Sequence, residues 1–115
     1  MALTRPYSLR IIHDPPITLY QPPSWTKCTR AFKKKAPIEV ASVECVAETE
    51  GYITVLTATG KQYSRRKTEM LTFHTEIQAI QATIADLEGM KRYAEPRSAE
   101  HIANVITYLR DSRRL

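Results

Sequence analysis

The 115-residue chain is predicted to fold as an α+β protein, with a three- to four-stranded antiparallel sheet in meander order followed by two C-terminal α-helices. Two observations lead to this prediction: strand-like alternation of apolar and polar residues across 38–66, and a change to helical spacing from Met70 onward. The length suits a single domain. We divide it into a proline-rich basic arm (1–35), antiparallel strands (36–67) and two helices (68–115).

The N-terminal arm is dominated by proline. Five of the seven prolines lie within residues 1–25, and Pro37 follows just beyond. Proline fixes φ and lacks the N–H that a sheet ladder needs, so we expect an irregular arm. Short extended pieces at Tyr7–Ile12 and Ile17–Tyr20 would supply at most an edge strand. Trp25 either pins this arm to the domain or stacks on a nucleic-acid base.

Three strands are expected after the arm. Residues 38–47 alternate, with a change of phase at Ala41–Ser42 that indicates a bulge or bend. Tyr52–Thr57 is rich in β-branched residues, and Gln62–Arg66 follows after a second turn. Residues 49–51 and 58–60 form the two turns, in which Gly51 is free to adopt a positive φ.

The C-terminal part shows helical periodicity. Gly89 is a plausible stop for the first helix, and Ser98 is a suitable N-cap for the second. The apolar stripe of the first helix is long for a domain of this size, so part of it is a candidate dimer interface. The two apolar stripes consist of Met70, Phe73, Ile77, Ile80, Ile84 and Leu87, then Ile102, Val105, Ile106 and Leu109.

The positive charge is grouped along the sequence. The net charge is +5, yet residues 1–35 carry seven bases and one acid, whereas residues 36–60 carry four acids and no base. A second basic group lies within 61–67, and the rest of the chain is nearly neutral. Clustered Lys and Arg attract phosphates, and they also occur as ordinary solvated surface.

The stretch Val40–Thr68 resembles the middle of a LytTR-type DNA-binding domain. The matching residues are Val43, Val46, Tyr52, Val55, Thr57, Gly60, Lys61, Tyr63, Arg66, Lys67 and Thr68. The resemblance implies an antiparallel β domain that regulates transcription, with Glu50, Gly51 and Tyr52 in a DNA-facing loop and Arg66 and Lys67 near the backbone. The family's later Phe-x-Arg-x-His segment is absent, and the final 45 residues are helical in pattern instead.

Catalytic and cofactor motifs are not found in the sequence. The three glycines form no phosphate loop, and His13, His74 and His101 are isolated. No His or second Cys lies near Cys28 or Cys45 at metal-ligand spacing, so no metal site, cofactor or disulfide is expected and Cys45 is interpreted as a buried thiol. We therefore expect a non-enzymatic, cytoplasmic protein without a membrane span or secretory signal.

Two functional hypotheses follow. In the first, the chain binds DNA through basic rims of the sheet and the 50–52 loop, with Arg66 and Lys67 forming a phosphate clamp at the start of the long helix. In the second, it is a protein-interaction module that binds a partner or dimerises through its C-terminal helices. The candidate DNA-binding residues are Lys33, Lys34, Lys35, Glu50, Gly51, Tyr52, Lys61, Arg65, Arg66 and Lys67.

Overall fold

The computed structural model describes residues 9–115 and confirms the α+β class. Four strands form one antiparallel sheet in the order β1-β2-β3-β4, and the last two helices follow it in the chain. A further helix, α1, lies between the first two strands. The elements are β1 (Ile11–Tyr20), α1 (Trp25–Lys34), β2 (Ser42–Glu48), β3 (Tyr52–Leu56), β4 (Gln62–Arg66), α2 (Glu76–Arg92) and α3 (Pro96–Arg113).

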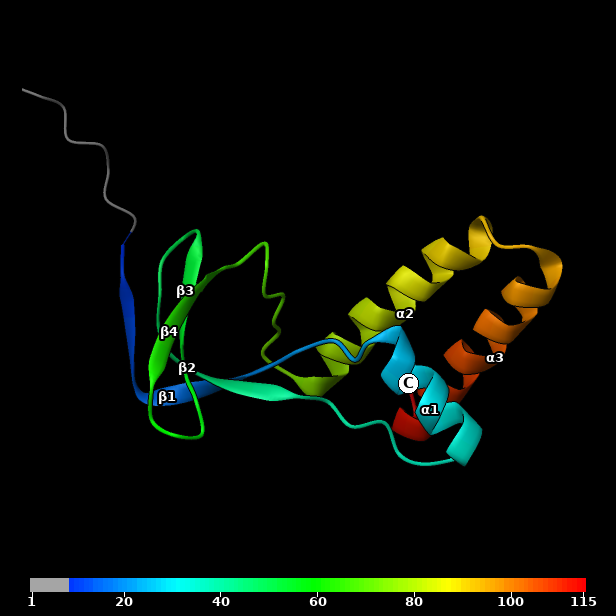
Figure 1. The fold of residues 1–115 in the computed structure, drawn as a ribbon, viewed down its shortest axis with the longest axis horizontal. Helices are drawn as coiled ribbons and strands as arrows, with labels where there is room; N and C mark the ends of the chain where they lie inside the picture. The colour runs from blue at the N-terminus through cyan, green and yellow to red at the C-terminus, as the bar shows by residue number, and fades with distance from the viewer. Residues whose placement is uncertain (1–8) are drawn as a thin grey trace, which may run out of the picture.

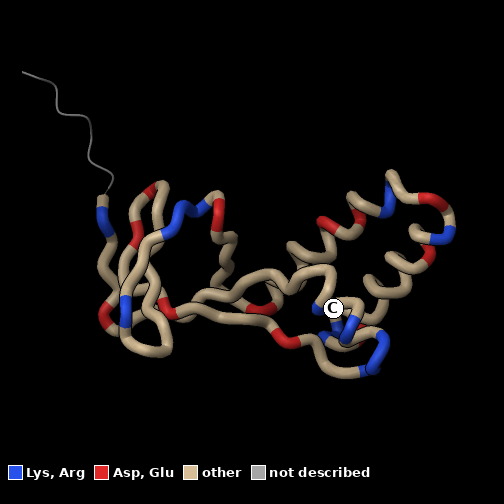
Figure 2. The backbone as a smooth tube through the Cα atoms, viewed as in Figure 1, with Lys and Arg blue, Asp and Glu red and all other residues tan. Residues whose placement is uncertain are grey.

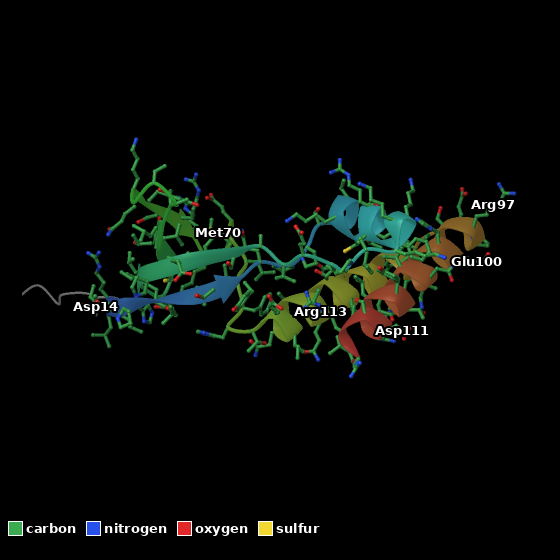
Figure 3. All side chains as sticks on the ribbon, turned by 90° about the horizontal axis from the view of Figure 1, so that it is seen from below. Asp14, Met70, Arg97, Glu100, Asp111 and Arg113 are labelled. Atoms are coloured by element: carbon green, nitrogen blue, oxygen red, sulfur yellow. The ribbon has the colours of Figure 1, made fainter. Side chains whose placement is uncertain are left out.

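The molecule is elongated, with principal extents of 62 × 34 × 22 Å. The sheet lies at one end and the three helices at the other, joined by the connecting segments of the chain (Figure 1). The perpendicular view shows the same separation, with Asp14 at the sheet end and Arg97 and Glu100 at the far helical end (Figure 3). We refer to residues 9–20 and 42–74 as the sheet lobe, and to residues 21–41 and 75–115 as the helical lobe.

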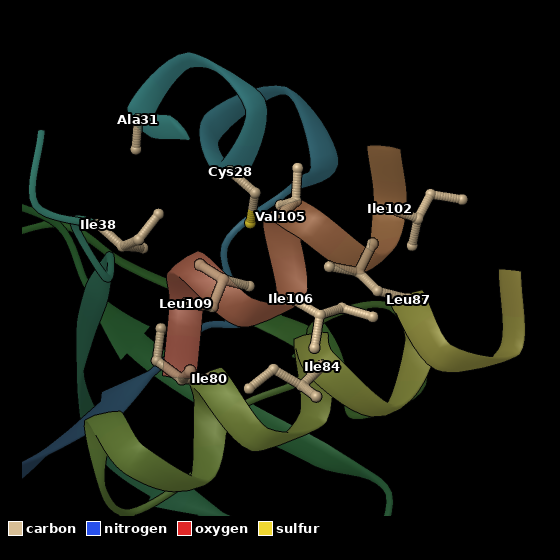
Figure 4. Close-up of a cluster of buried hydrophobic side chains, with 10 residues drawn as sticks. All are labelled: Cys28, Ala31, Ile38, Ile80, Ile84, Leu87, Ile102, Val105, Ile106 and Leu109. Atoms are coloured by element: carbon tan, nitrogen blue, oxygen red, sulfur yellow. The ribbon is translucent and has the colours of Figure 1, made fainter. Parts of the chain in front are cut away.

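Each lobe has its own apolar core. The core of the helical lobe brings together side chains from all three helices and from the segment before β2 (Figure 4): Cys28, Ala31, Ile38, Ile80, Ile84, Leu87, Ile102, Val105, Ile106 and Leu109. The core of the sheet lobe is smaller, with Leu19, Cys45, Ile53 and Val55 packed against Met70 and other half-buried residues. The helices therefore do not cover the sheet face, and each lobe buries its own apolar surface.

The arm is more ordered than its prolines suggested. β1 is a ten-residue edge strand that pairs with β2 despite Pro15 and Pro16, because the pairing is interrupted between Ile12 and Ile17. The prediction of an irregular segment up to residue 35 is wrong, since α1 occupies its last third. Ser24 accepts a hydrogen bond from the Lys27 backbone N–H and caps that helix. The predicted extended residues 7 and 8 lie outside the described part of the chain.

The first C-terminal helix begins later than its apolar stripe indicated. Thr75 caps α2 through the Gln78 N–H, so Met70 and Phe73 precede the helix. Met70 packs in the sheet core, and Phe73 forms backbone hydrogen bonds with Tyr20. A 3-4 spacing cannot distinguish one helix from a helix preceded by apolar residues that serve a different core.

Four local predictions are also corrected. α2 runs through Gly89 to Arg92, and α3 starts at Pro96 with Glu95 as its N-cap, so neither Gly89 nor Ser98 has the expected role. The irregularity in β2 lies between Cys45 and Ala47 rather than at residues 41–42. The glycine with positive φ is Gly60, at +87°, and not Gly51.

Other predictions are confirmed. β4 has the predicted bounds, and β3 ends one residue earlier than expected. Cys45 is a buried thiol as predicted, and Cys28, for which no burial was predicted, is buried and free as well. Among residues 9–115, no helix is both long enough and apolar enough to cross a membrane.

Candidate nucleic-acid interface

The predicted DNA-binding residues do not form one surface. Lys33 and Lys34 occupy the last turn of α1, and Lys35 is its C-cap with φ +52°, so all three belong to the helical lobe. The prediction that they form a rim of the sheet is wrong. Figure 2 shows the blue basic segments distributed over both lobes.

The other candidates lie at two ends of the sheet. Antiparallel pairing brings Tyr52 opposite Arg66, and the Lys67 N–H donates to the Gly51 carbonyl at 2.9 Å. Glu50–Tyr52 and Arg65–Lys67 therefore meet at one end, as the DNA hypothesis requires. Lys61 follows the β3–β4 turn and lies at the opposite end.

The predicted Arg66–Lys67 phosphate clamp lacks its helix terminus. The long helix begins only at Glu76, so no helix dipole strengthens an anion site beside these residues. Lys67 is also engaged, because its Nζ lies 3.1 Å from Glu48 Oε1. The Arg65 guanidinium lies 4.9 Å from the centre of the Tyr63 ring. These contacts weaken the case for a phosphate site at this end of the sheet.

The lobes differ in charge. The described sheet lobe contains five basic and five acidic residues, whereas the helical lobe contains eleven basic and seven acidic ones. Within the helical lobe, residues 75–115 are balanced at six of each. The positive excess therefore belongs to residues 21–41, which form α1 and its flanks and hold Glu39 as their single acid.

Three of the four basic side chains of α1 share one exposed face. Lys27, Arg30 and Lys34 are spaced at i, i+3 and i+7, and all three line one surface hollow, in which Glu39 is the single acid. This hollow has a volume of about 310 Å³. Among the described residues, none of the five bases from Lys27 to Lys35 forms an ion pair. Their charges are therefore available to a phosphate.

The opposite face of α1 fixes the helix to the core. Cys28 and Ala31 are buried, and Trp25 and Phe32 pack against the same cluster. Burial raises the pKa of the Cys28 thiol to about 11, so the thiol is neutral and behaves as an apolar core group. Both aromatic rings contact the His101 ring edge-on, with centroids 5.7 and 5.8 Å away. Trp25 thus anchors the arm, which favours the first of its two sequence interpretations.

Lys27 and Arg30 belong to this basic face but are absent from the candidate residues that the sequence predicts. The signal was present: apolar Cys28 and Ala31 alternate with Lys27, Arg30 and Lys34 at helical spacing after a Ser N-cap. The nearby prolines obscured it, although Pro22 and Pro23 precede the helix and do not interrupt it.

Comparison with known proteins finds no match to a family model, a curated protein or a solved structure. The LytTR resemblance therefore stays a prediction.

Proposed function

We propose that this protein binds nucleic acid, and that the basic face of α1 contacts the phosphate backbone. The observation that carries the proposal is the set of three unpaired bases, Lys27, Arg30 and Lys34, lining one hollow on a helix whose other face is buried. Binding by such a face releases counterions and depends strongly on salt. Duplex DNA is the first ligand to test.

The rigidity of α1 supports this proposal. Because the helix is held by its buried face, presenting the three bases to a phosphate backbone requires no folding on binding. The Tyr108 hydroxyl also donates a hydrogen bond to the Ala36 carbonyl just beyond the helix. When such a preformed basic face binds, only its side chains lose conformational freedom. Because the contacts are to phosphates, we expect moderate affinity that does not depend on the base sequence.

The test compares equal charge removal from the two lobes. The variant Lys27→Gln/Arg30→Gln/Lys34→Gln is expected to weaken binding to a fluorescent duplex and to lower the salt slope by about 3, roughly one unit per phosphate contact. The matched control is Lys61→Gln/Arg65→Gln/Arg66→Gln, which removes three charges from the sheet lobe and should leave the slope nearly unchanged.

Each alternative result has a definite meaning. If the control loses affinity and the α1 variant does not, DNA contacts lie on the sheet as the LytTR resemblance implies. If the wild-type protein binds duplex DNA more weakly than about 10⁻⁴ M at low salt, below ordinary non-specific binding, nucleic-acid binding is rejected. Circular dichroism of both variants checks that the fold is intact.

Self-association is a second candidate function, favoured by an apolar hollow at the far end of the helical lobe. Its volume is about 630 Å³, and Trp25, Met90 and Ile102 contribute to its wall. Tyr93 beside it is 92% exposed. A second copy of this chain is the occupant to test, because the C-terminal helices carry this surface. Light scattering over a concentration series should then show a dimer that Tyr93→Ser dissociates; a monomer at all concentrations removes this candidate.

A further inference from the structure

A cluster of possible metal ligands lies in the sheet lobe, away from α1. His13, Cys45 and Glu48 each offer one ligand atom, and these atoms all lie within 4.8 Å of one another. The sequence analysis missed this group because His13 is separated from Glu48 by 35 positions. The structure brings both a histidine and a cysteine beside the Glu48 carboxylate.

The irregular pairing of two strands creates the cluster. On β1 the ladder is broken between Ile12 and Ile17, and on β2 it shifts between Cys45 and Ala47. His13 lies within the first interruption, and Cys45 borders the second. Bulges redirect side chains locally, and they are common beside functional sites. Two facing irregularities thus bring three potential ligands to one point of an otherwise regular sheet.

Glu48 contacts a partner through each of its two carboxylate oxygens. His13 Nε2 lies 2.9 Å from Glu48 Oε2, while Lys67 Nζ lies 3.1 Å from Glu48 Oε1. The hydrogen bond from His13, followed by the Lys67 contact, lowers the pKa of the Glu48 carboxyl. Burial, followed by the nearby Glu48 charge, raises the pKa of the Cys45 thiol.

The arrangement suits a metal ion better than covalent catalysis. Cys45 is fully buried, so a substrate carbonyl cannot approach its sulfur, whereas an ion needs only a narrow path. Glu48 and Lys67 line a surface hollow of about 250 Å³, so the Glu48 carboxylate lies at the wall of a space that an ion can enter. Tetrahedral zinc places sulfur, nitrogen and oxygen ligands about 3.3–3.7 Å apart, so small side-chain rotations would close the cluster.

We propose that His13, Cys45 and Glu48 form a binding site for a zinc-type divalent cation. A thiolate and an imidazole select zinc over magnesium or calcium. The Cys45 thiol gives its proton to water as the metal–sulfur bond forms, and one His13 ring nitrogen and one Glu48 oxygen complete three protein ligands. Water takes the fourth position. Lys67 keeps its contact with the other Glu48 oxygen and orients the carboxylate.

The test uses Co²⁺ as a spectroscopic probe on the full chain. Titration should produce a thiolate-to-cobalt charge-transfer band that saturates at one equivalent and disappears when Zn²⁺ is added. Cys45→Ala should abolish the band. Cys28→Ala is the matched control, because Cys28 is an equally buried free thiol that belongs to no ligand cluster among the described residues, and it should retain the band.

A second variant keeps the proposal testable if Cys45→Ala fails to fold. His13 is only partly buried on an edge strand, so His13→Gln should fold and lower the apparent Zn²⁺ affinity by more than about tenfold. Calorimetry in two buffers should detect about one proton released per Zn²⁺ bound by the wild type. A folded wild type without the cobalt band, a band that persists in Cys45→Ala, or unchanged affinity in His13→Gln would each overturn the proposal.

Discussion

The two lobes are stabilised by different kinds of interaction. The helical lobe buries ten side chains in one cluster, while the sheet lobe buries four and adds polar contacts around them. Those contacts include His13 and Lys67 with Glu48, Thr18 with Glu44, and Thr54 with Ser64. A small sheet exposed on one side cannot bury much apolar area, so specific polar pairs carry a larger share of its stability.

The difference extends to what each lobe can bind. The helical lobe holds the positive excess on α1, whereas the described sheet lobe is neutral and contains the His13–Cys45–Glu48 cluster. Long-range charge favours encounter with a polyanion, while converging ligands favour a small ion. Nucleic-acid binding and metal binding are thus proposed for separate parts of the chain, and either can fail without the other.

The largest loss of stability is expected when one buried isoleucine in each core is replaced by alanine. Ile80→Ala in the helical core should cost about 3–4 kcal/mol, and Ile53→Ala in the sheet core about 2 kcal/mol, because a small cluster near the surface relaxes more readily. Both isoleucines are at most 2% exposed. Urea unfolding followed by far-ultraviolet circular dichroism measures both losses.

The same pair also tests whether the lobes unfold together. Trp25 is the single tryptophan of the chain and reports on the helical lobe alone. If the lobes are independent, Ile53→Ala should leave the fluorescence midpoint almost unchanged, whereas Ile80→Ala should lower it strongly. Equal shifts by both variants would mean one cooperative unit and would contradict the two-lobe comparison.

A smaller effect is expected from the polar network of the sheet lobe. Glu48→Gln should cost about 1.5 kcal/mol at neutral pH, because it removes the charge that His13 and Lys67 hold. The Glu48 pKa is lower in the folded protein than its usual value near 4.5, so its contribution is complete above that value. It is lost as pH falls through the folded pKa.

The pH dependence is measured as a difference between two proteins. Unfolding free energies of wild type and Glu48→Gln, determined from neutral to strongly acidic pH, should converge as the carboxyl becomes protonated. An equal gap at every pH would show that the variant acts through packing rather than through charge. The control is Glu44→Gln, which alters a second β2 carboxylate whose contact is the neutral Thr18 hydroxyl, and it should give a small gap.

The smallest expected effect comes from replacing a glycine by alanine, which should change stability in opposite directions in the two lobes. Gly60 in the sheet lobe has φ +87°, so Gly60→Ala should destabilise by about 1 kcal/mol. Gly89 lies within α2 and has no atom within 4 Å of an added Cβ, so Gly89→Ala should stabilise by up to about 1 kcal/mol. Thermal melts of the two variants should shift in opposite directions. A loss of stability in Gly89→Ala would contradict the helical geometry there.

Much of the architecture was predictable from local pattern. Strand alternation placed β3 and β4 closely, and the Ile102–Leu109 spacing identified α3, because these periodicities follow from backbone geometry. The blocks of charge and the buried state of Cys45 were also legible from the sequence. Such features depend on neighbours within a few residues, which a single sequence contains.

Only the tertiary structure decided how those segments combine. Met70 and Ile80 belong to one sequence stripe yet pack in different cores, and Lys33 and Arg66 belong to one charge class yet lie in different lobes. His13 meets Cys45 and Glu48 through strand pairing between distant segments. Spacing along the chain specifies which face a residue occupies, but the element opposite that face is chosen by burial of the whole chain, which local periodicity does not encode.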